Sequence, residues 1–311
     1  MTDWTTTRRG LLVAAGAGVG LAGCLGSGDD DDGGNGNSNE NGSDDGTADS
    51  TEQVNGVPAG DIEARREQMP DPGVTVDWSD AREFRKWLFD DGNASNGRFD
   101  YTEDLPPAED VDSPVLEVLD VYPDRVDGLL SQGTTQVVLG QFDADALETQ
   151  LAESDRYDAT DEYAGYALAG GTDDETSAGP IAVGDDALVL GAGYEAPIDA
   201  RHGDRDRLED VDPWMTHLLE TLPEDPLVTG EYLTPLVDTV DIDEIYCWGL
   251  SMPGRDAETA TWAFVFDDPD DITDDVRTEI RTLVDEVDDL ETDGRTLTMT
   301  GTVPESPDAG Q

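Results

Sequence analysis

The sequence predicts an α+β fold, a mainly antiparallel sheet with helices on one face. Three observations support this class. Several segments alternate apolar and polar residues, which is the pattern of half-buried strands. Other segments place apolar residues three or four positions apart, as amphipathic helices do. Finally, residues 115–170 and 242–303 share the order strand, strand, helix, strand at negligible identity, so the fold can comprise two strand-strand-helix-strand halves.

The first part of the folded chain is expected to hold two helices and two strands. Asp80 and Glu83 have the spacing of a capping pair before a short helix. Asp143 is a favoured cap for the second helix, because short polar side chains accept hydrogen bonds from exposed helix amides. The buried faces of these helices carry Phe84, Trp87, Leu88, Leu147 and Leu151. Alternation predicts the strands at residues 115–122 and 134–142.

The middle of the chain adds strands and a third helix. A strand is expected at residues 163–169, followed by a hairpin over residues 181–190 that turns at Gly184-Asp185-Asp186. Asp212-Pro213 predicts a helix start, because aspartate caps well and proline suits the first helical position. The buried stripe of that helix comprises Trp214, Met215, Leu218, Leu219 and Leu222.

The last third has the clearest pattern. Residues 245–252 and 261–267 alternate as strands, and residues 296–303 place threonine at every second position. This period of two predicts one apolar face and one face toward solvent. Thr273 begins a helix with the apolar stripe Val276, Ile280, Leu283, Val284 and Val287. We expect this stripe to cover Trp248, Trp262, Phe264 and Met299.

The N-terminus has the pattern of a removable signal. The pair Arg8-Arg9 directly precedes an uncharged run from Gly10 to Gly23. That run is shorter than the roughly 20 apolar residues needed to span a bilayer. A short apolar segment behind positive charge is typical of a signal peptide. We therefore expect residues 1–23 to be removed.

Two motifs within this segment resemble known export and anchoring signals. Arg8-Arg9 resembles twin-arginine export signals, and Leu21-Ala22-Gly23-Cys24 resembles the lipobox of lipoproteins. In lipoproteins the peptide is cut before the cysteine, and its thiol carries the lipid. The resemblance thus implies that Cys24 anchors the chain at the extracellular face of the cell membrane. The overall layout is similar to haloarchaeal lipoproteins exported by the twin-arginine route, whose function is unassigned.

The net charge of the chain restricts the environments in which it can fold and the partners that it can bind. The chain has 17 Lys+Arg against 74 Asp+Glu, a net charge of −57, and removal of residues 1–23 changes it to about −58. Repulsion among these carboxylates opposes folding unless salt screens it. An acidic chain with a single lysine resembles the proteins of halophiles. The other interpretations are a disordered acidic chain, a calcium or polycation binder and a nucleic-acid mimic. The 36% of hydrophobic residues, clustered in periodic segments, disfavours disorder throughout. The sign of the charge excludes nucleic acid as a partner.

The charged and polar segments define the domain organisation. Residues 24–70 are rich in Gly, Asp, Asn, Ser and Glu, so we expect a disordered acidic tether behind the anchor. Residues 71–311 are expected to form the extracellular α+β domain. Asn41 and Asn93 match the acceptor pattern for N-glycosylation.

No catalytic constellation stands out. His202 and His217 have no second ligand at zinc spacing, so no metal site is expected. Ser251 lacks the second glycine of a nucleophile elbow, and Cys247 is expected to be a buried, inert thiol. The run at residues 267–271 could bind calcium, but a solvated acidic surface at a helix start explains it as well. No cofactor is implied.

Two functional classes therefore remain. The favoured one is a membrane-anchored, cell-surface lipoprotein of a halophile whose domain binds a ligand or partner without catalysis. The alternative is an extracellular hydrolase that uses acidic residues. The absence of nucleophile motifs favours binding. A pocket with several inward carboxylates of raised pKa would reverse this order.

Overall fold

The structure is a computed structural model that describes residues 59–90, 97–107, 114–171, 179–233, 235 and 240–304. Its helices are α2 (Ala59–Gln68), the 3₁₀ helix η1 (Glu83–Trp87), α3 (Pro114–Leu119), α4 (Ala144–Glu153), α5 (Glu195–His202), α6 (Leu208–Val211), α7 (Pro213–Thr221), η4 (Pro269–Asp271), α8 (Asp274–Ile280) and η5 (Arg281–Leu283). Within the described ranges, no helix is both long and apolar enough to cross a membrane.

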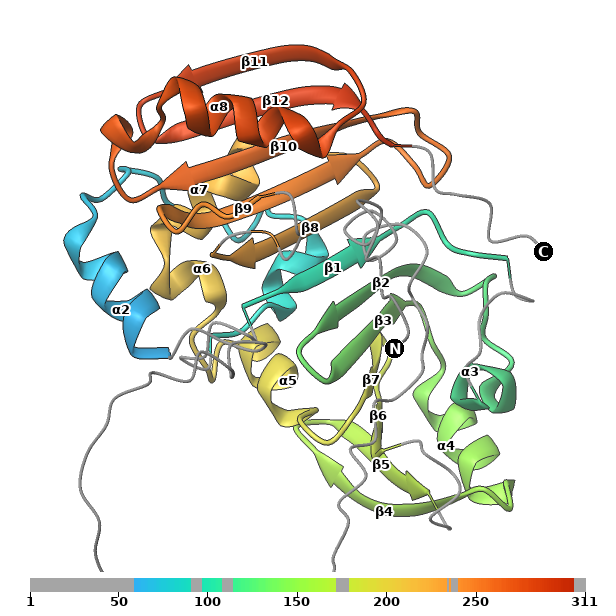
Figure 1. Ribbon diagram of the computed structural model, residues 1–311. Coiled ribbons are helices and arrows are strands. Elements are labelled where there is room, and N and C mark those ends of the chain that lie inside the picture. The colour runs from blue at the N-terminus through green and yellow to red at the C-terminus, as the bar shows by residue number, and fades with distance from the viewer. Residues whose placement is uncertain are drawn as a thin grey trace, which may run out of the picture.

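The strands form one sheet (Figure 1). They are β1 (Phe99–Thr102), β2 (Val126–Gln132), β3 (Thr135–Gly140), β4 (Tyr157–Tyr163), β5 (Tyr166–Gly171), β6 (Ile181–Val183), β7 (Ala187–Leu190), β8 (Leu227–Tyr232), β9 (Ile245–Met252), β10 (Thr259–Phe266), β11 (Val287–Asp293) and β12 (Thr296–Thr302). Their order is β11-β12-β10-β9-β8-β1-β2-β3-β7-β6-β5-β4, and the paired strands are antiparallel. The predicted α+β class with a mainly antiparallel sheet is confirmed.

The sheet is built from two similar units that meet where β1 pairs with β8. One unit runs β2, β3, α4, β4, β5, and the other runs β9, β10, α8, β11, β12. In each, a hairpin leads into a helix and then into a second hairpin. The β6–β7 hairpin is inserted between β3 and β5 of the first unit. Two related halves are therefore present, and in each the predicted last strand is one strand of a hairpin. The first half opens on β2 and not on the strand expected at residues 115–122.

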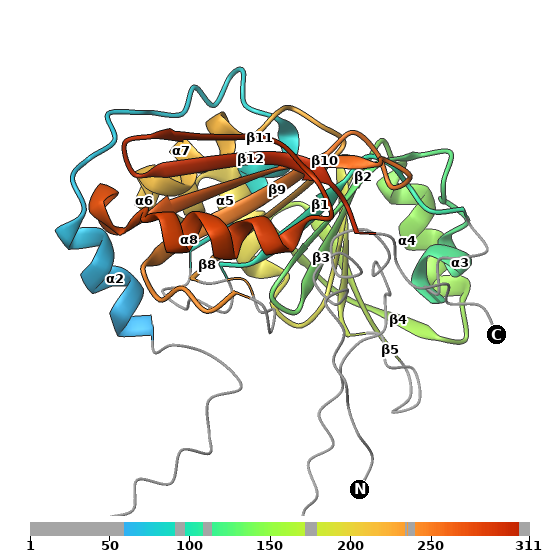
Figure 2. The same cartoon turned by 45° about the horizontal axis from the view of Figure 1, so that its top comes forward.

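Helices cover both faces of this sheet. Successive strand residues point to opposite faces. In β8, Leu227 packs in the apolar cluster with α8, whereas Val228 packs in the cluster with η1, α5 and α7. Leu227 and Leu129 both pair with Thr102, so the α4 cluster shares the face of α8. The expected layer of α4 and α8 thus has a second helical layer opposite it, and Figure 2 shows α8 and α7 on opposite sides.

Several element predictions need correction. Residues 115–122 do not form a strand, because Pro114 begins α3 and the buried Leu116 and Leu119 lie three positions apart. The expected strand at residues 163–169 is instead parts of β4 and β5 on either side of a turn. Asp80 does not cap η1, which is preceded by Arg82 without a side-chain cap.

The last third follows the prediction closely, with two differences. Ile280 and Leu283 are buried with Trp248, Trp262 and the other expected partners, and Val276 packs against them. However, α8 ends at Ile280, and Val287 begins the unpredicted strand β11. Thr296 is also buried rather than solvent-facing, because α7 lies over that end of β12 and His217 bonds its hydroxyl.

Helix α2 lies inside the range expected to be tether. It packs through Ile62, Arg65, Arg66 and Met69, a helical stripe of spacing three, one and three. Ile62 and Met69 join the apolar core, and Arg65 pairs with Asp267 at 2.8 Å. The packed part of the described chain therefore begins with α2.

Candidate ligand-binding site

A cavity of about 150 Å³ lies between η1 and the C-terminal end of α7. Its lining residues are Arg82, Phe84, Arg85, Leu219, Glu220, Leu222, Pro223, Glu224 and Val228. We call it the η1–α7 pocket. The lining residues come from three segments that the fold brings together, namely the η1 segment, the end of α7 with its following loop, and the start of β8.

A close approach between α7 and the sheet shapes the base of this pocket. Asp212 caps α7 by accepting a hydrogen bond from the amide of Trp214, and Pro213 is the first helical residue, as predicted. Gly249 of β9 lies beneath the helix. A Cβ there would stand 2.8 Å from Leu222 Cδ1 and 2.9 Å from a backbone oxygen, so a larger residue would push α7 away.

The η1 side of the pocket carries two immobilised guanidinium groups. Arg85 donates from Nε and Nη2 to the carboxylate of Glu209, with the Nε bond at 2.7 Å. Arg82 donates from Nη1 to the carbonyl of Asp225 at 2.9 Å and from Nη2 to Glu103 at 2.8 Å. Each guanidinium is already paired with a carboxylate, Arg85 with Glu209 and Arg82 with Glu103. The cationic wall is thus fixed before any ligand arrives.

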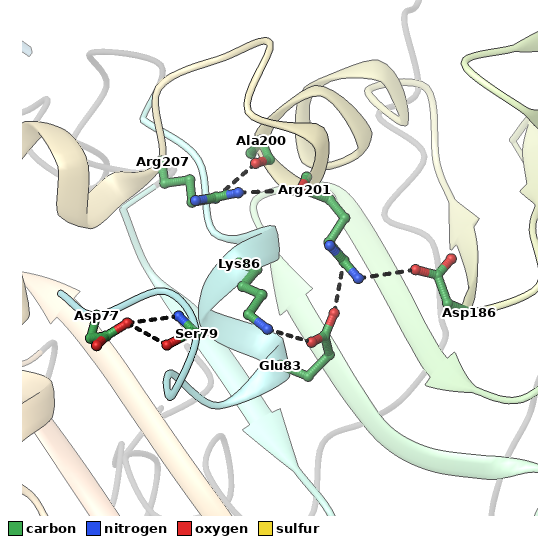
Figure 3. Close-up of polar contacts among 8 residues, drawn as sticks. All are labelled: Asp77, Ser79, Glu83, Lys86, Asp186, Ala200, Arg201 and Arg207. Atoms are coloured by element: carbon green, nitrogen blue, oxygen red, sulfur yellow. Dashed lines mark hydrogen bonds and ion pairs between the residues drawn. The ribbon is translucent and has the colours of Figure 1, made fainter.

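Further ion pairs hold η1 in place (Figure 3). Glu83 pairs with Lys86 at 3.0 Å and with Arg201 of α5 at 2.7 Å. Arg201 also lies 3.5 Å from Asp186. Arg207 donates a hydrogen bond of 3.2 Å to the carbonyl of Arg201, which secures the end of α5. These contacts bind the η1 segment to α5 and to the β6–β7 turn.

The α7 side of the pocket has the opposite charge. Glu220 and Glu224 are exposed lining residues at and just beyond the end of α7. The C-terminal end of a helix carries partial negative charge, which favours cations there. Between the two walls, Phe84, Leu222 and Val228 are buried and supply an apolar base. Phe84 is itself stacked on Tyr101 with ring centroids 4.1 Å apart.

A second polar site lies on the other face of the sheet, at the junction of the two units. Arg98 contacts Asp100 from Nε at 3.3 Å and Glu231 from Nη1 at 3.4 Å. Thr229 donates a hydrogen bond of 2.8 Å to Asp100. We call these four residues the junction patch. They separate the apolar cluster that contains α8 residues from the one that contains α3 and α4 residues.

Glu231 is the most perturbed group of the junction patch. Only 12% of its side chain is exposed. Burial raises the pKa of Glu231 to about 7, with nearby Asp100 adding to the rise and Arg98 opposing it. A catalytic site is expected to show several inward carboxylates of raised pKa. The junction patch has one, Glu231, in a pair that Arg98 bridges.

Asp212 forms a separate buried network that is structural. Besides capping α7, its carboxylate accepts hydrogen bonds from Tyr232 at 2.8 Å and Tyr246 at 2.6 Å. Arg66 of α2 lies 3.5 Å away. Cys247 is buried beside this network, as predicted, and burial raises the pKa of its thiol well above the ordinary value. The network fixes the start of α7 and docks α2.

Other residues that the sequence singled out do not form an active site. Within the described ranges no three His, Cys, Asp or Glu side chains gather as a metal site. His202 is exposed, whereas burial lowers the pKa of His217, which bonds Thr296 at 2.8 Å. Ser251 donates to Asp225 at 2.6 Å instead of to a histidine base. Residues 267–271 cap η4 and pair with α2.

Five predicted site residues, Arg8, Arg9, Cys24, Asn41 and Asn93, lie outside the described residues. Lipidation, export and glycosylation therefore stay predictions. The pocket residues, in contrast, were missed by sequence reasoning. One signal could have drawn attention to them, because Arg82, Arg85 and Lys86 place three of the 17 basic residues within five positions.

Comparisons with known proteins assign no family. No family model matches the chain, and no curated protein matches it. A solved structure titled "Structure of crystal form IV of TP0453" is similar with a TM-score of 0.37 and 8% identity. The match covers 70% of this chain and 92% of that one. A similarity of this size identifies neither a family nor a function.

Proposed function

We propose that this chain is a lipid-tethered surface protein whose α+β domain binds a small polar solute in the η1–α7 pocket without catalysis. The observation that carries the proposal is the pocket itself. Its two guanidinium groups are held by Glu209, Glu103 and the carbonyl of Asp225, so they would meet a solute without moving, and prepositioned groups reduce the cost of binding. Its apolar base gives the solute a dry surface to cover.

The composition of the pocket supports binding rather than catalysis. Its lining includes no serine, cysteine or histidine. Nucleophilic catalysis by a hydroxyl, thiol or imidazole needs such a group next to a base. A small solute that enters would therefore meet two arginines, the exposed carboxylates of Glu220 and Glu224, and apolar surface.

The sequence supports the location of this domain. Arg8-Arg9 fits export by the twin-arginine route, and Cys24 fits lipid attachment at the extracellular face of the membrane. A net charge of −57 fits an environment of high salt, where screening removes the repulsion between exposed carboxylates. A tether of residues 25–58 would hold the domain away from the membrane.

The anchor is tested by cell fractionation. Replacing Cys24 with serine should release the protein into the medium or leave the precursor uncleaved. Replacing Arg8 and Arg9 with lysine should retain it in the cell, whereas Arg156→Lys serves as a control outside the signal. A Cys24→Ser protein that is fully processed and still sediments with membranes would exclude lipid attachment.

Binding is tested by thermal unfolding of the full chain with a panel of small carboxylic acids, amines, amino acids and sugars. A solute that binds only the folded state raises the Tm with concentration. At least one should do so for the natural chain and for Thr278→Trp on α8, but not for Leu219→Trp, which fills the pocket. If no solute raises the Tm, or if Leu219→Trp responds equally, pocket binding is wrong.

The junction patch gives the hydrolase alternative a specific form. Glu231 would be the general acid, because its pKa is near 7. Asp100 would be the second carboxylate, and Arg98 bridges the two. Hydrolysis of glycoside or ester substrates that is lost in Glu231→Gln but kept in Leu219→Trp would favour this function over solute binding.

A further inference from the structure

We propose that the solute of the η1–α7 pocket is a zwitterionic α-amino acid with an aliphatic side chain. This inference rests on the proposed function and specifies its ligand. The three kinds of lining residue match the three parts of such a molecule, which are a carboxylate, an ammonium group and an apolar side chain.

The carboxylate would lie against the η1 wall. Guanidinium groups suit carboxylates because their planar donors match two oxygen atoms. Arg85 has already committed Nε and Nη2 to Glu209, and Arg82 has committed both terminal nitrogens. Both arginines line the same side of this small cavity, so a ligand carboxylate there would meet guanidinium groups whose positions are already fixed.

The ammonium group would lie toward the α7 wall. Glu220 and Glu224 line that side, and the C-terminal end of α7 adds partial negative charge. Glu220 and Glu224 already act electrostatically on Arg85. A simple carboxylic acid would add a further negative charge beside these glutamates, and a simple amine would add a further positive charge beside the arginines. Only a ligand with both charges complements both walls.

The size and base of the pocket limit the side chain. Its volume is about 150 Å³. Drug-sized ligands need about 300–1,000 Å³, so a long peptide or an oligosaccharide does not fit inside. The buried Phe84, Leu222 and Val228 favour an aliphatic group over a polar one, because removing apolar surface from water stabilises the complex.

Isothermal titration calorimetry of the full chain in molar KCl tests this inference with three matched probes. Leucine carries both charges, 3-methylbutanoate lacks the ammonium group, and 3-methylbutylamine lacks the carboxylate, while the apolar body is similar in all three. Leucine should bind at least tenfold more tightly than either of the others.

Variants separate the two walls. Glu220→Gln/Glu224→Gln should weaken leucine at least tenfold and leave 3-methylbutanoate unchanged or tighter. Arg82→Gln should weaken leucine and leave the amine unchanged or tighter. Glu291→Gln, which removes an exposed charge from β11, is the control and should change none of the three. Arg85 is not substituted in this test, because its loss would leave the buried charge of Glu209 without a partner.

The outcomes distinguish the zwitterionic ligand from pocket binding itself. If the acid or the amine binds as tightly as leucine, and Leu219→Trp abolishes that binding, the zwitterion is wrong and pocket binding stands. The same holds if none of the three binds while another solute raises the Tm through the pocket. If no small solute binds at the pocket, the proposed function falls together with this inference.

Discussion

Arg85 of η1 holds the carboxylate of Glu209 through two nitrogens and so joins segments 124 residues apart. The Glu209 side chain is fully inaccessible, and 13% of the Arg85 side chain is exposed. Burial raises the pKa of Glu209 above its ordinary value, and Arg85 opposes that rise. The pair therefore neutralises a buried charge and fixes one wall of the η1–α7 pocket.

Removing Arg85 alone should be strongly destabilising. Arg85→Met leaves Glu209 buried without its charge partner, and breaking such a pair costs about 3–5 kcal/mol. The double variant Arg85→Met/Glu209→Met removes both charges and should recover much of that loss. Denaturant titration at constant salt measures the free energy of unfolding. A double variant no more stable than Arg85→Met would contradict this account of the pair.

Glu231 should make stability depend on pH in a defined window. Its pKa is raised from about 4.5 to about 7 in the folded state, so the folded chain keeps this proton to higher pH than the unfolded chain. The free energy of unfolding therefore falls as pH rises from about 4.5 to 7. Glu231→Gln lacks this contribution. Its stability relative to the natural chain should rise across the window by on the order of 3 kcal/mol, at about 1.4 kcal/mol per pKa unit.

The same titrations with Glu291→Gln provide the matched control, because that exposed residue lies far along the sheet on β11. A constant difference between Glu231→Gln and the natural chain from pH 4.5 to 8 would contradict the raised pKa. A difference that grows as pH falls would contradict its direction.

The packing of α8 predicts unequal costs for a substitution in α8 and one in β12. Ile280 is completely buried between α8 and the sheet, so Ile280→Ala should cost about 2–5 kcal/mol. Thr298 of β12 is half-buried, and Thr298→Ala should cost under about 1 kcal/mol. Denaturant unfolding ranks the two, and the reverse order would show that α8 does not anchor this part of the core.

The charge of the chain predicts that folding depends on salt. With a net charge of −57, dilution should strengthen repulsion between carboxylates as the Debye length grows from under about 3 Å above 1 M salt to about 10 Å at 0.1 M. Circular dichroism should show loss of secondary structure or a falling Tm during dialysis to low salt. An unchanged spectrum and Tm over that range would exclude a halophilic fold.

The sequence predicts local periodicity better than boundaries. The apolar face of β12 and the burial of Ile280 against the sheet are confirmed because each follows the period of its own element. The threonine face is half-buried rather than exposed, and the stripe beyond Ile280 lies in η5, the following loop and β11. Residues 115–122 were assigned to the wrong element because a short apolar run fits a strand or a helix equally well. Strand β11 does not stand out in the sequence because only Val287 and Leu290 of its seven residues are apolar and most of the others are exposed acids.

The pocket was beyond sequence reasoning for a different reason. Arg82 and Arg85 lie more than 130 residues from Glu220, and their proximity depends on the pairing of β1 with β8. That pairing is set by how the two units meet, which no local pattern specifies. The hydrogen bonds from Arg82 to the carbonyl of Asp225 and from Arg85 to Glu209 likewise join distant segments.

The most direct test of the proposed function is a methyl NMR titration of the full chain in molar KCl, with labelled leucine and valine methyl groups. On addition of the solute panel, the methyl signals of Leu222 and Val228 at the base of the pocket should shift with saturation. The methyl signals of Leu147 and Leu151, which are buried between α4 and the opposite face of the sheet, should not shift. Solutes that leave Leu222 and Val228 unmoved, or that shift only the α4 methyls, would contradict a binding site between η1 and α7.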